Sequence, residues 1–167
     1  SGNISLQDNP LLASLGGLED LAWVGGRVRL WRNDALVDVD GLTSLASIGG
    51  ELSLDDNPLL EDLDGLSSLA GEVEDLEILA HPSLTQIDGL LGLEAVTREL
   101  IISGVDSLVH VDGLGGIETV GGALTIADGP LVADLEGLSG LVGVGGAITL
   151  ADLGDVPDVD ALLGLTA

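Results

Sequence analysis

The stretch G-E-L-S-L-D-D-N-P-L-L-E-D-L-D-G-L-S-S-L, residues 50–69, decides the fold, because variants of it recur along the chain at a fixed spacing. The chain divides into six repeats of 24 residues and a last one of 22. They begin at Gly2, Gly26, Gly50, Glu74, Arg98, Gly122 and Gly146. Seven apolar positions recur in each of the seven repeats, and Leu, Ile or Val fills 47 of these 49 positions. Of the other two, one holds Glu72 and the last lies beyond residue 167. Such a period is typical of a solenoid, so we predict a single solenoid domain over residues 1–167 with about seven turns.

Each repeat predicts the same local structure. The alternation at residues 51–55 indicates a short strand whose two leucines face inward. Asn57-Pro58 then ends the strand in a turn, and residues 64–69 read as a single helical or 3₁₀ turn with Asp64 as its N-cap. One parallel strand per repeat, stacked at about 4.8 Å, makes a β-rich rod roughly 34 Å long.

Glycine pairs mark the corners between repeats. At residues 49–50 two glycines allow a tight corner in which a side chain would not fit. The pair is lost at residues 73–74 and 97–98. We therefore predict deformed corners near residues 71–75 and 95–99.

The composition combines strong acidity with high hydropathy. There are 29 Asp and Glu against 4 Lys and Arg, and the net charge is -25, which excludes a nucleic-acid partner because phosphates are repelled. With 46% hydrophobic residues and a mean hydropathy of +0.50, the chain is expected to fold. Without Cys it forms no disulfide or thiolate metal site. The longest uncharged stretch, residues 137–151, is too short for a membrane span, so no membrane insertion is expected.

Repeats such as residues 50–69 resemble the leucine-rich-repeat-like turns of receptor L domains, and more closely the L-domain-like repeats of bacterial secreted and surface proteins. The resemblance covers essentially the whole chain. It implies a right-handed coil, an extracellular or cell-surface setting, and a non-enzymatic role in binding or adhesion with a protein or carbohydrate ligand. The cysteines that close animal receptor L domains are absent, so the resemblance does not extend to animal receptor function.

Two rows of acidic residues follow from the repeat. The first row holds Asp40, Asp64, Asp88, Asp112, Glu136 and Asp160, and the second holds Asp38, Asp62, Asp134 and Asp158. Like charges about 5 Å apart repel by about 0.8 kcal/mol per pair in water. In one interpretation the first row caps the following turns by accepting backbone N–H groups. In the other, Asp38, Asp40, Asp62 and Asp64 bind Ca²⁺ between repeats, because hard cations take carboxylate oxygens; no other cofactor is predicted.

The second repeat has the most distinctive local chemistry. Three of the four basic residues lie there: Arg27, Arg29 and Arg32. Arg27, Arg29 and Trp31 take the three outward strand positions, with Asp55 on the next repeat. Together these four side chains predict a surface that stacks a sugar ring or captures an acidic partner. The alternative is purely structural: Arg27 pairs with Glu51, and Arg29 folds over Trp31.

Other features suggest other functions. His81 and His110 lie on different repeats without a nucleophile, so no enzyme is predicted.

The outward Ala and Thr side chains of residues 123–127 and 147–151 form a small, uncharged surface, which favours docking and leaves ice binding as a minor alternative. The open ends indicate either further chain or pairing with other copies. A structural subunit that stacks end to end into a filament is therefore the rival of the binding module.

Overall fold

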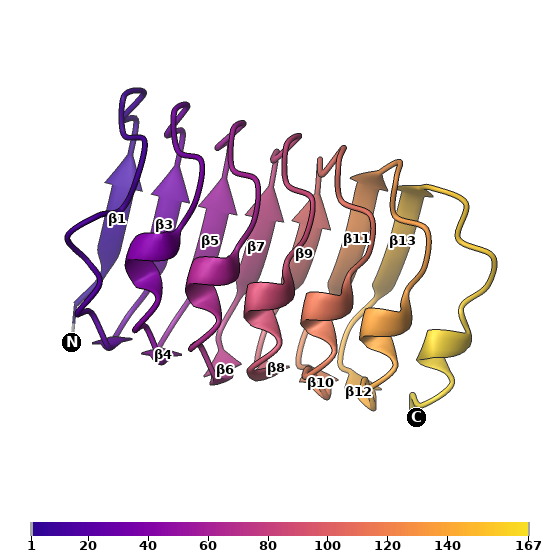
Figure 1. Cartoon of the computed structure of the whole chain (residues 1–167). Coiled ribbons are helices and arrows are strands. Elements are labelled where there is room, and N and C mark those ends of the chain that lie inside the picture. The colour runs from indigo at the N-terminus through magenta and orange to yellow at the C-terminus, as the bar shows by residue number, and fades with distance from the viewer. Residues whose placement is uncertain (1, 167) are drawn as a thin grey trace.

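The computed structural model describes residues 2–166 and shows one continuous parallel β-solenoid (Figure 1). Its main sheet has seven parallel strands in the order β1-β3-β5-β7-β9-β11-β13. Their bounds are Ile4–Gln7, Val28–Trp31, Leu52–Asp55, Leu76–Leu79, Leu100–Ser103, Leu124–Gly129 and Ile148–Leu153. Each strand pairs with its counterpart in the next repeat, so that Leu30 lies opposite Leu54. The predicted β-rich solenoid is therefore confirmed.

A second set of very short strands lies where one repeat passes into the next. Strands β6, β8, β10 and β12 form a four-stranded sheet, and β2 pairs with β4. Their bounds are Trp23–Val24 (β2), Ser47–Ile48 (β4), Gly71–Val73 (β6), Leu93–Val96 (β8), Thr119–Val120 (β10) and Gly143–Val144 (β12). Most of these strands are only two residues long, too short for an alternation pattern to reveal.

Six 3₁₀ turns form the other side of the coil, facing the main sheet (Figure 1). They are η1 Asp40–Leu42, η2 Asp64–Leu66, η3 Asp88–Leu90, η4 Asp112–Leu114, η5 Glu136–Leu138 and η6 Asp160–Leu162. The single turn predicted from the Asp-Gly-Leu motif is confirmed. Within residues 2–166, none of the helical segments has the length and apolar character that a membrane crossing requires.

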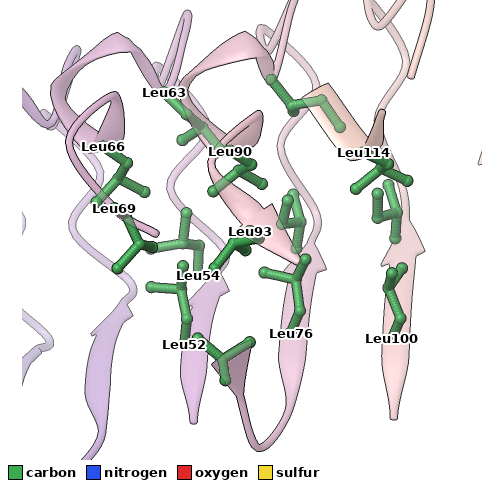
Figure 2. Close-up of a cluster of buried hydrophobic side chains, with 14 of the residues drawn as sticks. Leu52, Leu54, Leu63, Leu66, Leu69, Leu76, Leu90, Leu93, Leu100 and Leu114 are labelled. Atoms are coloured by element: carbon green, nitrogen blue, oxygen red, sulfur yellow. The ribbon is translucent and has the colours of Figure 1, made fainter. Parts of the chain in front are cut away.

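The interior of the coil is one continuous apolar column. Leu52 and Leu54 from the sheet meet Leu63 and Leu66 from the 3₁₀ side, and all four are at most 1% exposed (Figure 2). At about 25 cal/mol per Å² of buried apolar surface, this column is the main stabilising contribution. Because each leucine contacts the repeats before and after its own, a repeat buries its apolar side only within the stack.

The 3₁₀ turns stack so closely that their middle residue has no room for a side chain. A Cβ atom on Gly89 would lie 1.8 Å from the backbone oxygen of Leu63 in the preceding repeat. Gly41, Gly65, Gly113 and Gly137 face the preceding backbone in the same way, at 2.1, 2.1, 1.9 and 1.9 Å. In the last repeat Ala161 takes this position, so η6 cannot approach η5 as closely.

The corner at residues 71–75 is deformed, as predicted. The pairing of β6 with β8 shifts between Gly71 and Glu72. Gly71 adopts a φ of +82°, a conformation open to glycine. The register changes by one residue, because Gly71 lies opposite Leu93 whereas Glu72 lies opposite Ala95. As a result Val73 enters the core at 2% exposure, and Glu72 is exposed.

For the corner at residues 95–99 the prediction of a deformed backbone is wrong. Strand β8 pairs with β10 without a shift, and Ala95 lies opposite Thr119. The backbone N–H of Thr97 donates to the carbonyl of Val73 at 2.9 Å. Thr97 and its neighbour Arg98 are exposed, so both side chains leave the corner toward solvent and the backbone keeps its regular path.

Candidate functional site

The outward face of β1, β3 and β5 brings together the side chains predicted as a binding surface. The register places Gln7, Trp31 and Asp55 side by side. Two residues earlier along each strand, the neighbouring row holds Ser5, Arg29 and Ser53. Because side chains alternate along a strand, these two rows project from the same side of the sheet, away from the core.

The indole ring of Trp31 has two guanidinium groups close to it. The Cζ atoms of Arg29 and Arg32 each lie 5.4 Å from the ring centroid. Arg32 also pairs with Asp8 at 3.1 Å and with Asp56 at 3.9 Å, which holds its guanidinium beside the ring. The predicted folding of Arg29 over Trp31 is therefore confirmed, and the ring is engaged by two cation-π contacts.

Arg27 and Arg29 form no ion pair with any of residues 2–166. The Arg27–Glu51 pair of the structural interpretation is thus not found. The backbone N–H of Arg27 donates to Oδ1 of Asn3 at 3.0 Å, whereas its guanidinium has no carboxylate partner. By contrast Arg98 pairs with Asp75 at 3.0 Å. Two neighbouring arginines are therefore left without a counterion in a chain that has 29 acidic residues.

A polar groove of about 520 Å³ opens at the base of these strands. Its side walls include Arg27, Glu51, Glu74 and Arg98. The glycine pairs at residues 25–26 and 49–50 line it with backbone alone, so nothing covers Arg27 from that side. The groove extends the outward face of β3 and β5 toward the corner.

In the acidic rows, the prediction that the first row caps the 3₁₀ turns is wrong. The residue at the N-cap position of η2 is Leu63, and no side chain caps it. The second row supplies the bond: Oδ1 of Asp62 accepts the backbone N–H of Asp64 at 3.0 Å. Asp38, Asp134 and Asp158 accept the equivalent N–H, and Gln86 does so through Oε1. A carboxylate two residues before the N–H closes an Asx turn, a geometry the helix N-cap pattern does not describe.

The four residues predicted to bind Ca²⁺ are not arranged around a common point. Across residues 2–166 no group of three or more His, Asp or Glu side chains is placed to hold a metal ion. The Asp38 carboxylate raises the pKa of Asp40, and burial, Asp62 and Asp64 raise it further. This direction is the like-charge repulsion expected of stacked carboxylates.

A row of polar side chains runs along the end of the sheet, where the sequence has its Asn-Pro turn motif; Asn33 and Asn57 in this row are fully buried. Nδ2 of Asn9 donates to Oδ1 of Asn33 at 3.2 Å, and Nδ2 of Asn33 donates to Oδ1 of Asn57 at 3.1 Å. His81 occupies the next place and is fully buried. The recurrence of Asn at a separation of 24 residues was the signal in the sequence. Its role is structural, because each amide ties one repeat to the next.

The far end of the sheet presents the small surface that the sequence predicts. Thr125 lies opposite Thr149, and Ala127 lies opposite Ala151. On the other side, Thr125 meets Ile101, so the threonine row covers two repeats. A row of this length offers little for a repeating ligand such as ice.

The chain was compared with known proteins. No family model, no curated protein and no solved structure matches it.

Proposed function

We propose that this chain is a non-enzymatic binding module that holds an acidic ligand on the outward face of β1, β3 and β5. The observation that supports it is the pair Arg27 and Arg29, which project from one face with no counterion among residues 2–166, in a protein of net charge -25. A free guanidinium takes a carboxylate, sulfate or phosphate through two parallel hydrogen bonds. Arg27, directly before β3, and Arg29 within it together form an anion-binding stripe.

An acidic ligand suits this face better than a neutral sugar. A neutral sugar binds mainly by stacking on an aromatic ring, and the ring of Trp31 already has guanidinium groups beside it. An acidic ligand can replace the cation-π contact that Arg29 makes with the ring by a stronger, charge-assisted hydrogen bond. The net negative charge opposes binding only locally, since salt screens charges beyond about 8 Å at physiological ionic strength.

The setting belongs to the same proposal. The repeat pattern resembles bacterial leucine-rich-repeat-like and L-domain-like proteins, which act outside the cell in recognition and adhesion. We propose an extracellular or cell-surface location and an adhesive role on that ground. A solenoid presents a long, rigid row of strands, which suits contact with an extended ligand.

The test is a calorimetric titration with two probes of equal size, a galacturonate trisaccharide and a neutral galactose trisaccharide. The acidic probe should bind and the neutral one should not. Replacing both Arg27 and Arg29 by Gln should weaken binding by about tenfold or more, because each charge-assisted bond contributes about 1.5–3 kcal/mol. Arg98→Gln is the matched control, since that guanidinium is already paired, and it should stay within about twofold. Equal binding of both probes, or an unaffected double variant, would show the proposal to be wrong.

End-to-end association is a second candidate function. In the described part of the chain β1 and β13 are the outer strands of the main sheet. Leu11 near one end and Leu163 near the other are 91% and 81% exposed. Unpaired strand edges beside exposed leucines are templates for adding another copy. Sedimentation over a concentration series tests it: rods that lengthen with concentration support a filament, and a monomer throughout rejects it.

A further inference from the structure

Ser53 is buried on a face of the sheet that otherwise points to solvent. Its side chain is 1% exposed, and Oγ has no hydrogen-bond partner among residues 2–166. On this face its direct neighbours in the register are Arg29 on one side and Glu77 on the other. Neither of these side chains forms a hydrogen bond to the Ser53 hydroxyl. Buried hydroxyls in folded proteins are normally hydrogen-bonded, so the unpaired hydroxyl of Ser53 is unusual.

Arg29, which lies directly opposite Ser53, shows the same feature. Its Nε is buried and has no partner in the described part of the chain. The end of the guanidinium is held over Trp31, at 5.4 Å from the ring centroid. Two hydrogen-bond donors on paired residues are therefore both buried and both unused. A single acceptor group placed between the two residues would satisfy both of them.

We propose that Arg29 and Ser53 form a subsite for the acidic group of a sugar ring, and that Arg29 covers this subsite in the structure described here. When the guanidinium of Arg29 swings off Trp31, Nε–H and the Ser53 hydroxyl can both donate to one carboxylate. The same movement frees a face of the indole ring, on which the C–H face of the sugar stacks. This inference rests on the proposed function and names its ligand class: a chain of uronic acids.

The other side chains around the ring favour a sugar over an acidic peptide. Gln7 and Asp55 flank Trp31 in the register, one on each neighbouring strand. An amide and a carboxylate beside an aromatic ring offer both donors and acceptors for sugar hydroxyls. Arg32 stays in place, because Asp8 and Asp56 hold it, so the movement of Arg29 opens the ring without dismantling the site.

The experiment uses a Trp23→Phe protein, in which Trp31 is the remaining tryptophan and its fluorescence reports on the subsite. Titration with a galacturonate trisaccharide should change the Trp31 emission. Ser53→Ala should weaken binding by about fivefold or more, since one charge-assisted bond is lost. It should also raise the melting temperature by about 2 °C, because an unpaired buried hydroxyl is removed. Ser67→Ala is the matched control: Ser67 is exposed and directly follows η2 on the 3₁₀ side of the coil, away from the subsite, and its replacement should change neither value.

The outcomes separate this inference from the proposed function. Absence of any binding to the Trp23→Phe protein overturns both. If the acidic sugar binds and Ser53→Ala leaves its affinity unchanged, or lowers the melting temperature, the subsite is wrong and the binding face stands. If a triaspartate peptide binds as tightly as the sugar with the same emission change, the assignment to a sugar is wrong.

Discussion

The imidazole Nδ1 of His81 lies 3.0 Å from the backbone carbonyl oxygen of Asn57, at the end of the buried row of asparagine side chains. A carbonyl oxygen can only accept, so Nδ1 carries the proton. Nε2 is buried and has no partner within residues 2–166. One repeat earlier, Nδ2 of Asn57 donates to the Leu30 carbonyl at 3.0 Å. Histidine thus ends an amide row with one atom unsatisfied, and its protonation disturbs the core.

We expect His81 to make the fold less stable in mild acid. Burial lowers the pKa of His81 from its usual 6.5, although the carbonyls of Asn57 and Leu54 and the carboxylates of Asp55 and Asp56 act in the opposite direction. Above pH 6.5 neither state is protonated and His81 adds no pH dependence. Below it the unfolded state binds the proton first, so the free energy of unfolding falls by up to about 1.4 kcal/mol per pH unit.

The measurement is urea unfolding at pH 7.5 and 5.5 for the protein and for His81→Asn. Asparagine continues the row and cannot titrate, so the variant should lose less stability between the two pH values. The carboxylates are common to both proteins and cancel in the comparison. Equal losses in both would contradict the assignment of this pH dependence to His81.

Gly89→Ala should be severely destabilising. The added Cβ would lie 1.8 Å from the Leu63 carbonyl oxygen, which is backbone and cannot turn aside. We expect a loss of about 3 kcal/mol or more in the free energy of unfolding, beyond ordinary overpacking. Gly143→Ala is the control, because the nearest atom to its Cβ would be at an ordinary 3.9 Å, and it should change stability by less than about 1 kcal/mol. Similar unfolding midpoints for both variants would mean that the 3₁₀ turns stack less tightly.

A column of left-handed residues follows the main strands and predicts opposite effects at adjacent repeats. The column consists of Asp8, Arg32, Asp56, Ala80, Gly104, Asp128 and Asp152, with φ between 50° and 70°. Ala80→Gly should stabilise the protein by about 0.5–1 kcal/mol, and Gly104→Ala should destabilise it by about 1–2 kcal/mol. Ala127→Gly, in regular strand, should instead destabilise by about 0.5–1 kcal/mol. Thermal unfolding of the three variants checks the signs, and a destabilised Ala80→Gly protein would refute the conformational argument.

The capping role of the second acidic row can be tested at η5. Oδ1 of Asp134 accepts the backbone N–H of Glu136 at 3.1 Å. Asp134→Ala should therefore lower the free energy of unfolding by about 1 kcal/mol, and Asp134→Asn, which keeps the acceptor, by only a few tenths. Glu136→Ala should have little effect. A larger loss for Glu136→Ala than for Asp134→Ala would restore the first row as the capping row.

The fold could be predicted from the sequence because the repeat imposes one environment on equivalent residues. Leu52 and Leu54 had to face inward, since strand alternation and a fixed period leave no other place for them. The capping residue could not be predicted correctly, because the N-cap pattern assumes an α-helix. In the 3₁₀ turn the bonded N–H belongs to Asp64 itself, and the acceptor is Asp62. The shift that places Val73 in the core instead of Glu72 was visible in the sequence only as a charged residue at an apolar position of the repeat.

For the candidate site, the sequence predicted which side chains share the outward face but could not predict their ion pairs. The outward positions of Arg29 and Trp31 follow from alternation along β3, and the same alternation extends to Arg27 directly before it. Whether an arginine finds a counterion depends on side chains in other repeats. Arg98 forms an ion pair with Asp75, whereas Arg27 forms none with Glu51, although Arg27 and Glu51 line the same groove.

The sequence by itself determined the solenoid, its strands and the arrangement of charge in rows, because each of these follows from a period that puts equivalent residues in register. Only the tertiary structure decided which charges are paired and which polar atoms are buried without a partner. These properties of Arg29, Ser53 and His81 depend on atoms contributed by neighbouring repeats. Their distances are set by how closely the repeats stack.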